Sequence, residues 1–240
     1  KTKRVTNRPV MATLNAVFSW SADSKFIFTT FVPQKRGAEP EEPYVDLPQI
    51  RVSTTDVNRL RTSPALLQNP YEAELLAYYT TGQLARIDVA KSKILDIGSP
   101  GLIREVSVSP DGEHLLVTRL KTPFSYIVPV NSFGWIQEVW NLKGEAVATL
   151  QTSEDREGIP DYNVLEYENR SQIAWRPDGR GLSMILSPEK KENDKENGEE
   201  ETDKQDDKPE TWKVIQWKAP FTDADMEVVY ESKKKFNNVS

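Results

Sequence analysis

The sequence contains three copies of one short pattern, and this repetition constrains the fold more than any other feature. Each copy has alternating apolar residues, a turn built on Asp23, Asp111 or Asp178, and a second apolar run. In "VSVSPDGEHLLVTRL" and "IAWRPDGRGLSMIL" the turn contains Pro, which fixes φ, and Gly, which adopts positive φ without strain. In "FSWSADSKFIFTT" Ser24 replaces that Gly. The pattern predicts three equivalent β-hairpins.

Further strand-like runs follow each hairpin. They are "QLARIDVAKSKILDIG" after the first, "FSYIVPV" and "IQEVWNLKGEAVATL" after the second, and "TWKVIQW" and "MEVVYES" after the third. A hairpin with about two further strands makes a four-stranded antiparallel unit, which a β-propeller repeats around an axis. We therefore expect an all-β chain, a β-propeller segment of about three four-stranded antiparallel blades with one short helix in an insertion. A two-sheet sandwich is the competing interpretation.

The turns are separated by 88 and then 67 residues, so the connections must contain insertions. The expected organisation has five parts: 1–11 as the end of a preceding blade, 12–100 as a blade with a Pro-rich and helical insertion, 101–170 as a blade plus connection, 171–232 as a blade with an acidic insertion at 188–210, and 233–240 as the start of a next blade or a tail.

Two insertions in the first blade have distinct compositions. Residues 32–55 are rich in Pro, which has no backbone donor for a sheet, so an extended loop is expected. In "NPYEAELLAYY", Asn69 can cap a helix whose first residue is Pro70, with Glu72 and Glu74 near its positive end. A short helix is therefore predicted there.

The acidic insertion accounts for the net charge of the chain. Residues 189–210 contain 11 acidic and 5 basic residues, and the remainder has 26 of each. The balanced remainder shows no basic face for nucleic acid, so no nucleic-acid partner is expected. Because the insertion has no apolar anchor, we interpret it as a dispensable solvated loop, with a calcium or partner site as the alternative.

Residues typical of catalytic sites are sparse. The chain has no cysteine, and no apolar run approaches the ~20 residues of a membrane helix. The single histidine, His114, is expected at a strand start, and Ser183 in "GLSMI" lacks the second Gly of a nucleophile elbow and falls in a predicted strand. The sequence therefore offers no catalytic, cofactor-binding or metal-binding residue, and no cofactor is expected.

Two further expectations concern the first strand of each hairpin. Arg104, Arg170 and Arg176 flank these strands and could present positive charge to an acidic substrate, although the pattern favours ordinary surface arginines. Trp20 and Trp175 occupy the same place in the repeat. Both are expected to be largely buried between neighbouring sheets.

Three stretches together resemble a known family. The sequences "RGAEPEEPYVDLPQI", "NPYEAELLAYYTTGQLARIDV" and "LKTPFSYIVPVNSFGWIQEVWNLKGE" are similar to the propeller of the prolyl oligopeptidase family of serine peptidases. The glutamyl endopeptidase branch, often named dipeptidyl aminopeptidase or acylaminoacyl peptidase in bacteria, is the most similar. The likeness runs from about Val17 to Trp175 and is strongest at Pro123 to Trp140.

The resemblance implies a function for the chain. In this family a propeller shields the active site of an α/β-hydrolase domain and restricts access to peptides. The expected partners are therefore a hydrolase domain of the same polypeptide and peptide substrates, in the periplasm or outside the cell. The alternative is a non-catalytic propeller that binds protein or peptide partners in the bacterial envelope. A Gly-x-Ser-x-Gly segment elsewhere in the same reading frame would separate the two hypotheses.

Overall fold

The computed structural model describes residues 4–14, 17–43, 65–155, 170–188 and 211–234. The chain divides into two units, 1–165 and 166–240, which are considered separately below. The predicted acidic insertion and the end of the Pro-rich segment lie outside the described residues.

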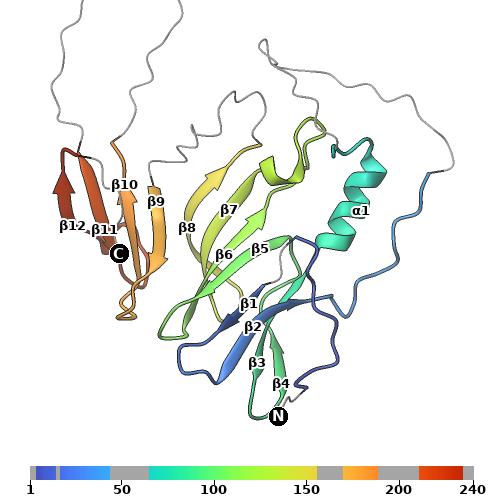
Figure 1. Ribbon diagram of the computed structural model, residues 1–240, viewed down its shortest axis with the longest axis horizontal. Helices are drawn as coiled ribbons and strands as arrows, with labels where there is room; N and C mark the ends of the chain where they lie inside the picture. The colour runs from blue at the N-terminus through green and yellow to red at the C-terminus, as the bar shows by residue number, and fades with distance from the viewer. Residues whose placement is uncertain (1–3, 15–16, 44–64, 156–169, 189–210, 235–240) are drawn as a thin grey trace, which may run out of the picture. The chain divides into compact units, whose positions relative to one another are not determined.

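Within its described residues, the first unit contains two four-stranded antiparallel sheets and one α-helix (Figure 1). Each sheet is a meander, in which strands adjacent in the chain are adjacent in the sheet. The first sheet consists of β1 (Phe18–Trp20), β2 (Phe26–Phe31), β3 (Gln83–Asp88) and β4 (Lys93–Asp96). The second consists of β5 (Ile103–Val108), β6 (His114–Leu120), β7 (Trp135–Asn141) and β8 (Ala146–Ser153).

The second unit repeats this arrangement once. Its sheet also follows chain order, with β9 (Arg170–Trp175), β10 (Leu182–Leu186), β11 (Trp212–Trp217) and β12 (Met226–Ser232). Among the described residues, short 3-10 helices lie at Val130–Ser132 in the first unit and at Asp223–Asp225 in the second. Three consecutive meanders are what a propeller segment requires, so the predicted fold class of three four-stranded blades is confirmed.

The three predicted hairpins share one register. Trp20 pairs with Ile27, Val108 with Leu115 and Trp175 with Leu182, which are matching positions of the repeat. The turns also match, because Ser24, Gly112 and Gly179 all have positive φ, at 58°, 74° and 72°. Ser24 thus accepts a conformation that is uncommon for a residue with a side chain.

A carboxylate closes each turn. Asp23 and Asp111 accept hydrogen bonds from the backbone N–H groups two residues further on and from the hydroxyls of Ser21 and Ser109. These bonds hold the pKa of Asp23 at about 2, with the Ser21 hydroxyl as the largest cause. The Asp of each copy therefore acts locally, as an Asx-type turn residue.

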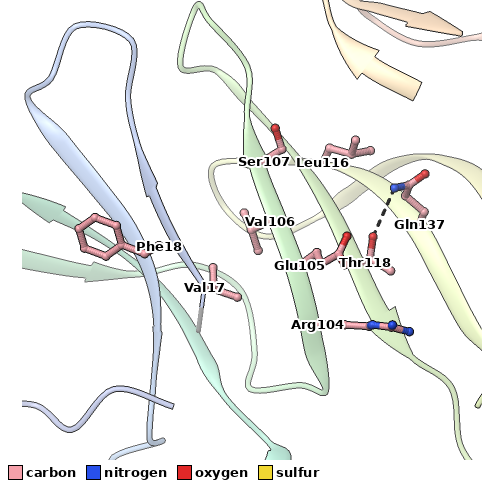
Figure 2. A pocket seen from close by; sticks show the side chains of 9 residues that line it. All are labelled: Val17, Phe18, Arg104, Glu105, Val106, Ser107, Leu116, Thr118 and Gln137. Carbon is pink, nitrogen blue, oxygen red and sulfur yellow. Dashed lines mark hydrogen bonds between the residues drawn. The ribbon is translucent and has the colours of Figure 1, made fainter. Parts of the chain in front are cut away.

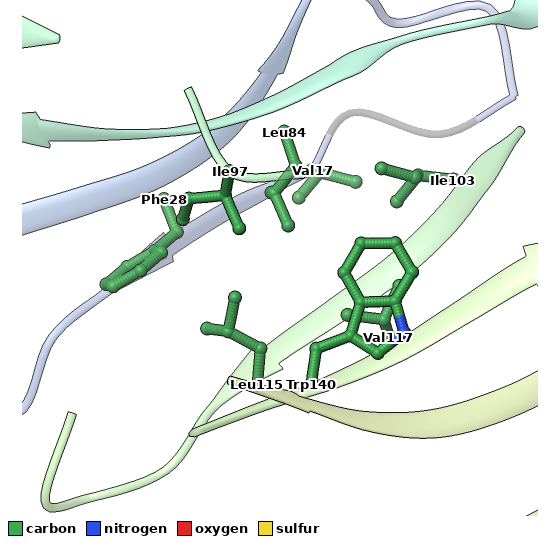
Figure 3. Close-up of a cluster of buried hydrophobic side chains, with 8 residues drawn as sticks. All are labelled: Val17, Phe28, Leu84, Ile97, Ile103, Leu115, Val117 and Trp140. Carbon is green, nitrogen blue, oxygen red and sulfur yellow. The ribbon is translucent and has the colours of Figure 1, made fainter. Parts of the chain in front are cut away.

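The first and second sheets pack face to face (Figure 3). One face of the first sheet contributes Phe28 and Leu84, and the facing side of the second contributes Leu115, Val117 and Trp140. All five are at most 8% exposed. Burial of this apolar surface is the main stabilising term that joins the two sheets.

The expected burial is wrong for Trp20. Trp20 is 47% exposed and Trp175 is half-buried, whereas their partners Ile27 and Leu182 are buried. The reason is topological, because β1, β5 and β9 are edge strands with a neighbour on one side only. In this repeat, the buried side chains belong mainly to the second strand of each hairpin.

The predicted helix is confirmed as α1, Pro70–Thr80. The Asn69 side chain accepts a hydrogen bond from the Glu72 N–H at 2.8 Å, and Pro70 is the first helical residue. Asn69 therefore satisfies one of the free backbone N–H groups at the start of the helix, and Pro70 has no N–H that needs an acceptor. The helix begins where its sequence predicts.

The run "FSYIVPV" forms a loop, not the strand expected from its composition. Pro123 and Pro129 lack the N–H that a ladder needs. Phe124, Val128 and Phe133 are instead buried together against Leu76 and Ala77 of α1. The apolar side chains therefore serve the contact between loop and helix.

The beginning of the Pro-rich segment, residues 32–43, is extended loop as expected. Arg36 holds it to the helix, with its guanidinium 3.9 Å from the Tyr78 ring centroid and its Nε donating to the Tyr78 carbonyl at 3.0 Å. A cation over an aromatic face adds an attraction to this hydrogen bond. Arg36 thus anchors residues 32–43 to α1.

A carboxylate is buried on the face of the second sheet that packs against the first. Glu138 is 5% exposed and accepts two hydrogen bonds from Arg119, at 2.9 and 3.1 Å, and one from Trp140 Nε1 at 2.9 Å. Burial alone would raise the pKa of Glu138, but these donors outweigh it and the pKa lies below its ordinary 4.5. The Glu of the "EVW" segment is therefore a buried carboxylate whose hydrogen bonds are satisfied.

Glu138→Gln should lower the free energy of unfolding at neutral pH by roughly 1–3 kcal/mol, reduced by the partial exposure of Arg119. A lowered folded-state pKa stabilises the fold above pH 4.5 and ceases to do so as the pH falls below it. The difference between wild type and variant should therefore shrink in acid. Urea melts across this pH range test it, with the exposed Glu113→Gln as the control; a difference that stays constant with pH contradicts the assignment.

Candidate functional site

The innermost strands of the first two sheets approach one another, and a depression lies where β1 and β5 meet (Figure 2). Its volume is about 270 Å³. Four successive residues of β5, from Arg104 to Ser107, line it together with Val17 and Phe18. Leu116, Thr118 and Gln137 complete the wall. Because consecutive strand residues take part, the depression follows the free edge of β5 and extends onto one face.

An irregularity in β5 determines how Arg104 is placed. Ile103 pairs with Arg119 and Glu105 with Thr118, so Arg104 is an extra residue in the strand. Such bulges bend a strand and change the direction of a side chain. Figure 2 shows Arg104 and Glu105 on the same side as Thr118 and Gln137. The bulge thus brings a cation and a carboxylate to one wall.

Hydrogen bonds fix the polar wall beside them. The Gln137 Nε2 donates to Thr118 Oγ1 at 3.3 Å, and Gln137 Oε1 accepts from Gln151 Nε2 at 3.0 Å. Thr118 is 8% exposed, and its hydroxyl donates to no group within the described ranges. The wall therefore keeps one hydroxyl donor next to the guanidinium of Arg104.

The three arginines singled out in the sequence have different surroundings. Arg176 donates to both carboxylate oxygens of Asp178 and to Gln216 Oε1, at 3.0, 2.5 and 2.6 Å. The Arg176 guanidinium holds the pKa of Asp178 well below its ordinary range. Arg170 lies over the Trp217 ring, 5.7 Å from the centroid. Only Arg104 of the three has neither an ion pair nor a hydrogen bond within the described residues.

The other candidates lie where the sequence places them. His114 is the first residue of β6 and Ser183 lies within β10, with its hydroxyl 3.5 Å from the Ala174 carbonyl. They belong to different units. In the described ranges no three His, Asp or Glu side chains gather as a metal site, and no helix has the length and apolar character to cross a membrane.

Sequence reasoning missed Phe18, Thr118 and Gln137 as neighbours of Arg104. They come from three separate strands, and only the strand register brings them together. The signal that was available, an arginine flanking a first strand, identified Arg104 together with Arg170 and Arg176.

Comparison with known proteins identifies relatives. No protein-family model matches the chain. A probable chloroplastic glutamyl endopeptidase of Oryza sativa subsp. japonica is 34% identical over 170 residues, which is 69% of this chain and 18% of that protein. The chain is therefore similar to part of a glutamyl endopeptidase. The corresponding Arabidopsis thaliana protein is 32% identical over the same shares, so the chain spans less than a fifth of these relatives.

Solved structures similar to this chain are also peptidases. The β-propeller domain of the trilobed protease from Pyrococcus furiosus aligns with 89% of this chain and 42% of its own, at 11% identity and a TM-score of 0.34. An acylaminoacyl peptidase in complex with a chloromethyl ketone aligns with 92% of this chain and 25% of its own, at 13% identity and a TM-score of 0.39. The resemblance seen in the sequence, to the glutamyl endopeptidase branch of the prolyl oligopeptidase family, is confirmed by the curated relatives.

Proposed function

We propose that this chain is the non-catalytic propeller part of a serine peptidase. It shields the active site of an α/β-hydrolase domain located elsewhere in the same polypeptide and restricts which peptides reach it. The observation that carries the proposal is the 34% identity to a glutamyl endopeptidase over 69% of the chain. The expected location, periplasmic or secreted, stays a prediction.

The packing of the sheets suits a rigid barrier. The first two sheets share a core of large apolar side chains at most 8% exposed, so they behave as one block. Their innermost strands converge while polar side chains line the depression between them. A wall of this kind excludes folded proteins by size and contacts an extended peptide through its edge.

Hydrolysis assays on two proteins test this proposal. The isolated chain should not cleave Glu- or Pro-directed chromogenic peptides, because it lacks a nucleophile elbow. The full-length polypeptide should cleave short peptides and spare folded proteins. Cleavage by the isolated chain that disappears in Ser183→Ala or His114→Ala would contradict the non-catalytic role, and so would cleavage of folded proteins at the rate of short peptides.

A further inference from the structure

We propose that the depression at β1 and β5 binds a carboxylate of an extended peptide, with Arg104 as the residue that pairs with it. This inference rests on the proposed function, which brings peptides to the propeller, and it adds a specific contact. The carboxylate can come from an acidic side chain or from a peptide C-terminus.

The charge of Arg104 is the first argument. The side chain is half-buried in a concave wall, and it has no anionic or hydrogen-bonding partner among the described residues. A partly desolvated guanidinium without a counter-ion has a higher free energy than a paired one. A ligand carboxylate removes that deficit, because the planar guanidinium can donate two parallel hydrogen bonds to it.

The rest of the depression suits a carboxylate attached to a peptide. The Thr118 hydroxyl can donate to the same anion, since its oxygen already accepts from Gln137. Phe18 is 63% exposed and provides an apolar surface for the methylene groups next to the carboxylate. β5 is the edge strand of its sheet, and an extended chain can add beside an edge strand. A folded partner would not fit a volume of about 270 Å³.

Glu105 opposes the binding of an anion. Its removal therefore tests the proposal through an effect opposite in sign to that of removing Arg104. The exposed Glu105 side chain lines the same wall and has no ion pair within the described residues. Its charge repels a ligand carboxylate, so its removal should strengthen binding, whereas removal of the Arg104 charge should weaken it. General surface electrostatics predicts the same signs for any arginine or glutamate, so the distinguishing result is that the loss occurs at Arg104 and not at a distant arginine.

The test is fluorescence anisotropy of the isolated chain with labelled peptides at low ionic strength, where charges are weakly screened. Three peptides separate the sources of the carboxylate: one with a central Glu and an amidated C-terminus, its Gln twin, and the Gln twin with a free C-terminus. The Glu peptide, the free C-terminus peptide or both should bind more tightly than the amidated Gln twin. Whichever binds more tightly identifies the source.

Variants locate the site. Arg104→Gln should weaken binding of the carboxylate peptide about tenfold. Glu105→Gln should tighten it about twofold. Arg180→Gln, which removes an exposed arginine of the second unit, should leave it unchanged. Thermal melts of all three variants should match wild type, since neither side chain in the depression is bonded.

Three results would overturn the proposal: no dependence on a carboxylate, equal losses in Arg104→Gln and Arg180→Gln, or no binding at all. Binding of all three peptides alike, with full-length polypeptide active on short peptides, would reject the Arg104 site and leave the proposed function intact. An inactive full-length polypeptide would reject the proposed function separately.

Discussion

Truncation of Phe28 to alanine should lower the free energy of unfolding by about 3–5 kcal/mol. The ring is 1% exposed and lies in the core shared by the first two sheets (Figure 3). Its removal leaves a cavity that the surrounding strands cannot close, because both sheets are held by their own ladders. The loss should therefore include a cavity contribution beyond the transfer of the ring.

Phe18→Ala provides the matched control. It removes the same side chain from the same sheet, but at a position that is 63% exposed, where substitutions usually change stability by about 0.5 kcal/mol or less. Urea denaturation followed by far-ultraviolet circular dichroism measures both. Similar losses in the two variants would mean that the first and second sheets do not pack through Phe28.

The hairpins could be predicted from sequence because their determinants are local. Asp111 and Gly112 act on groups within a few residues of themselves, and alternation on either side sets the register. The helix was predictable for the same reason, since Asn69 and Pro70 determine where it begins. Such local determinants can be recognised in the sequence without knowing which parts of the protein pack against the hairpin or the helix.

Burial and the candidate site could not be predicted in the same way. Trp20 has a large apolar side chain of the kind usually found in a core, yet it is exposed because β1 is an edge strand. The order of strands in the sheet is needed to know this. The direction of Arg104 depends on a bulge, which no residue type in "IREVSV" indicates. The exposure of Trp20 and the direction of Arg104 both depend on how strands pair, which local sequence does not specify.

The described parts of the three stretches that resemble the peptidase family contact one another in sequence order. The start of the Pro-rich segment is held to α1 by Arg36, and α1 packs on the loop that contains Phe124 and Phe133. The same stretch continues into β7, where Glu138 joins the core. The part of the sequence that most specifically resembles the family therefore encodes one connected region of the structure, which reaches the depression at β5 through Gln137.

Gly144→Ala should lower the free energy of unfolding by about 2–4 kcal/mol, through positive-φ strain and overpacking together. Gly144 has a φ of 83° in the turn between β7 and β8, and a Cβ there would lie 2.3 Å from the Gly98 backbone. That backbone follows β4 of the first sheet and donates to the Lys143 carbonyl at 3.0 Å. The two sheets thus touch main chain to main chain, and a methyl group must separate them.

Gly112→Ala is the control that separates the strain of positive φ from the steric contact of the added methyl group. Its φ is 74°, but a Cβ there would have no atom within 4 Å, so only the strain of about 1–2 kcal/mol should appear. Chemical denaturation of both variants gives the difference, which measures the approach of Gly98 to Gly144. Equal losses would show that the turn and the segment after β4 are not in contact in solution. A larger loss in Gly144→Ala would locate a second contact between the sheets, in addition to that between β1 and β5.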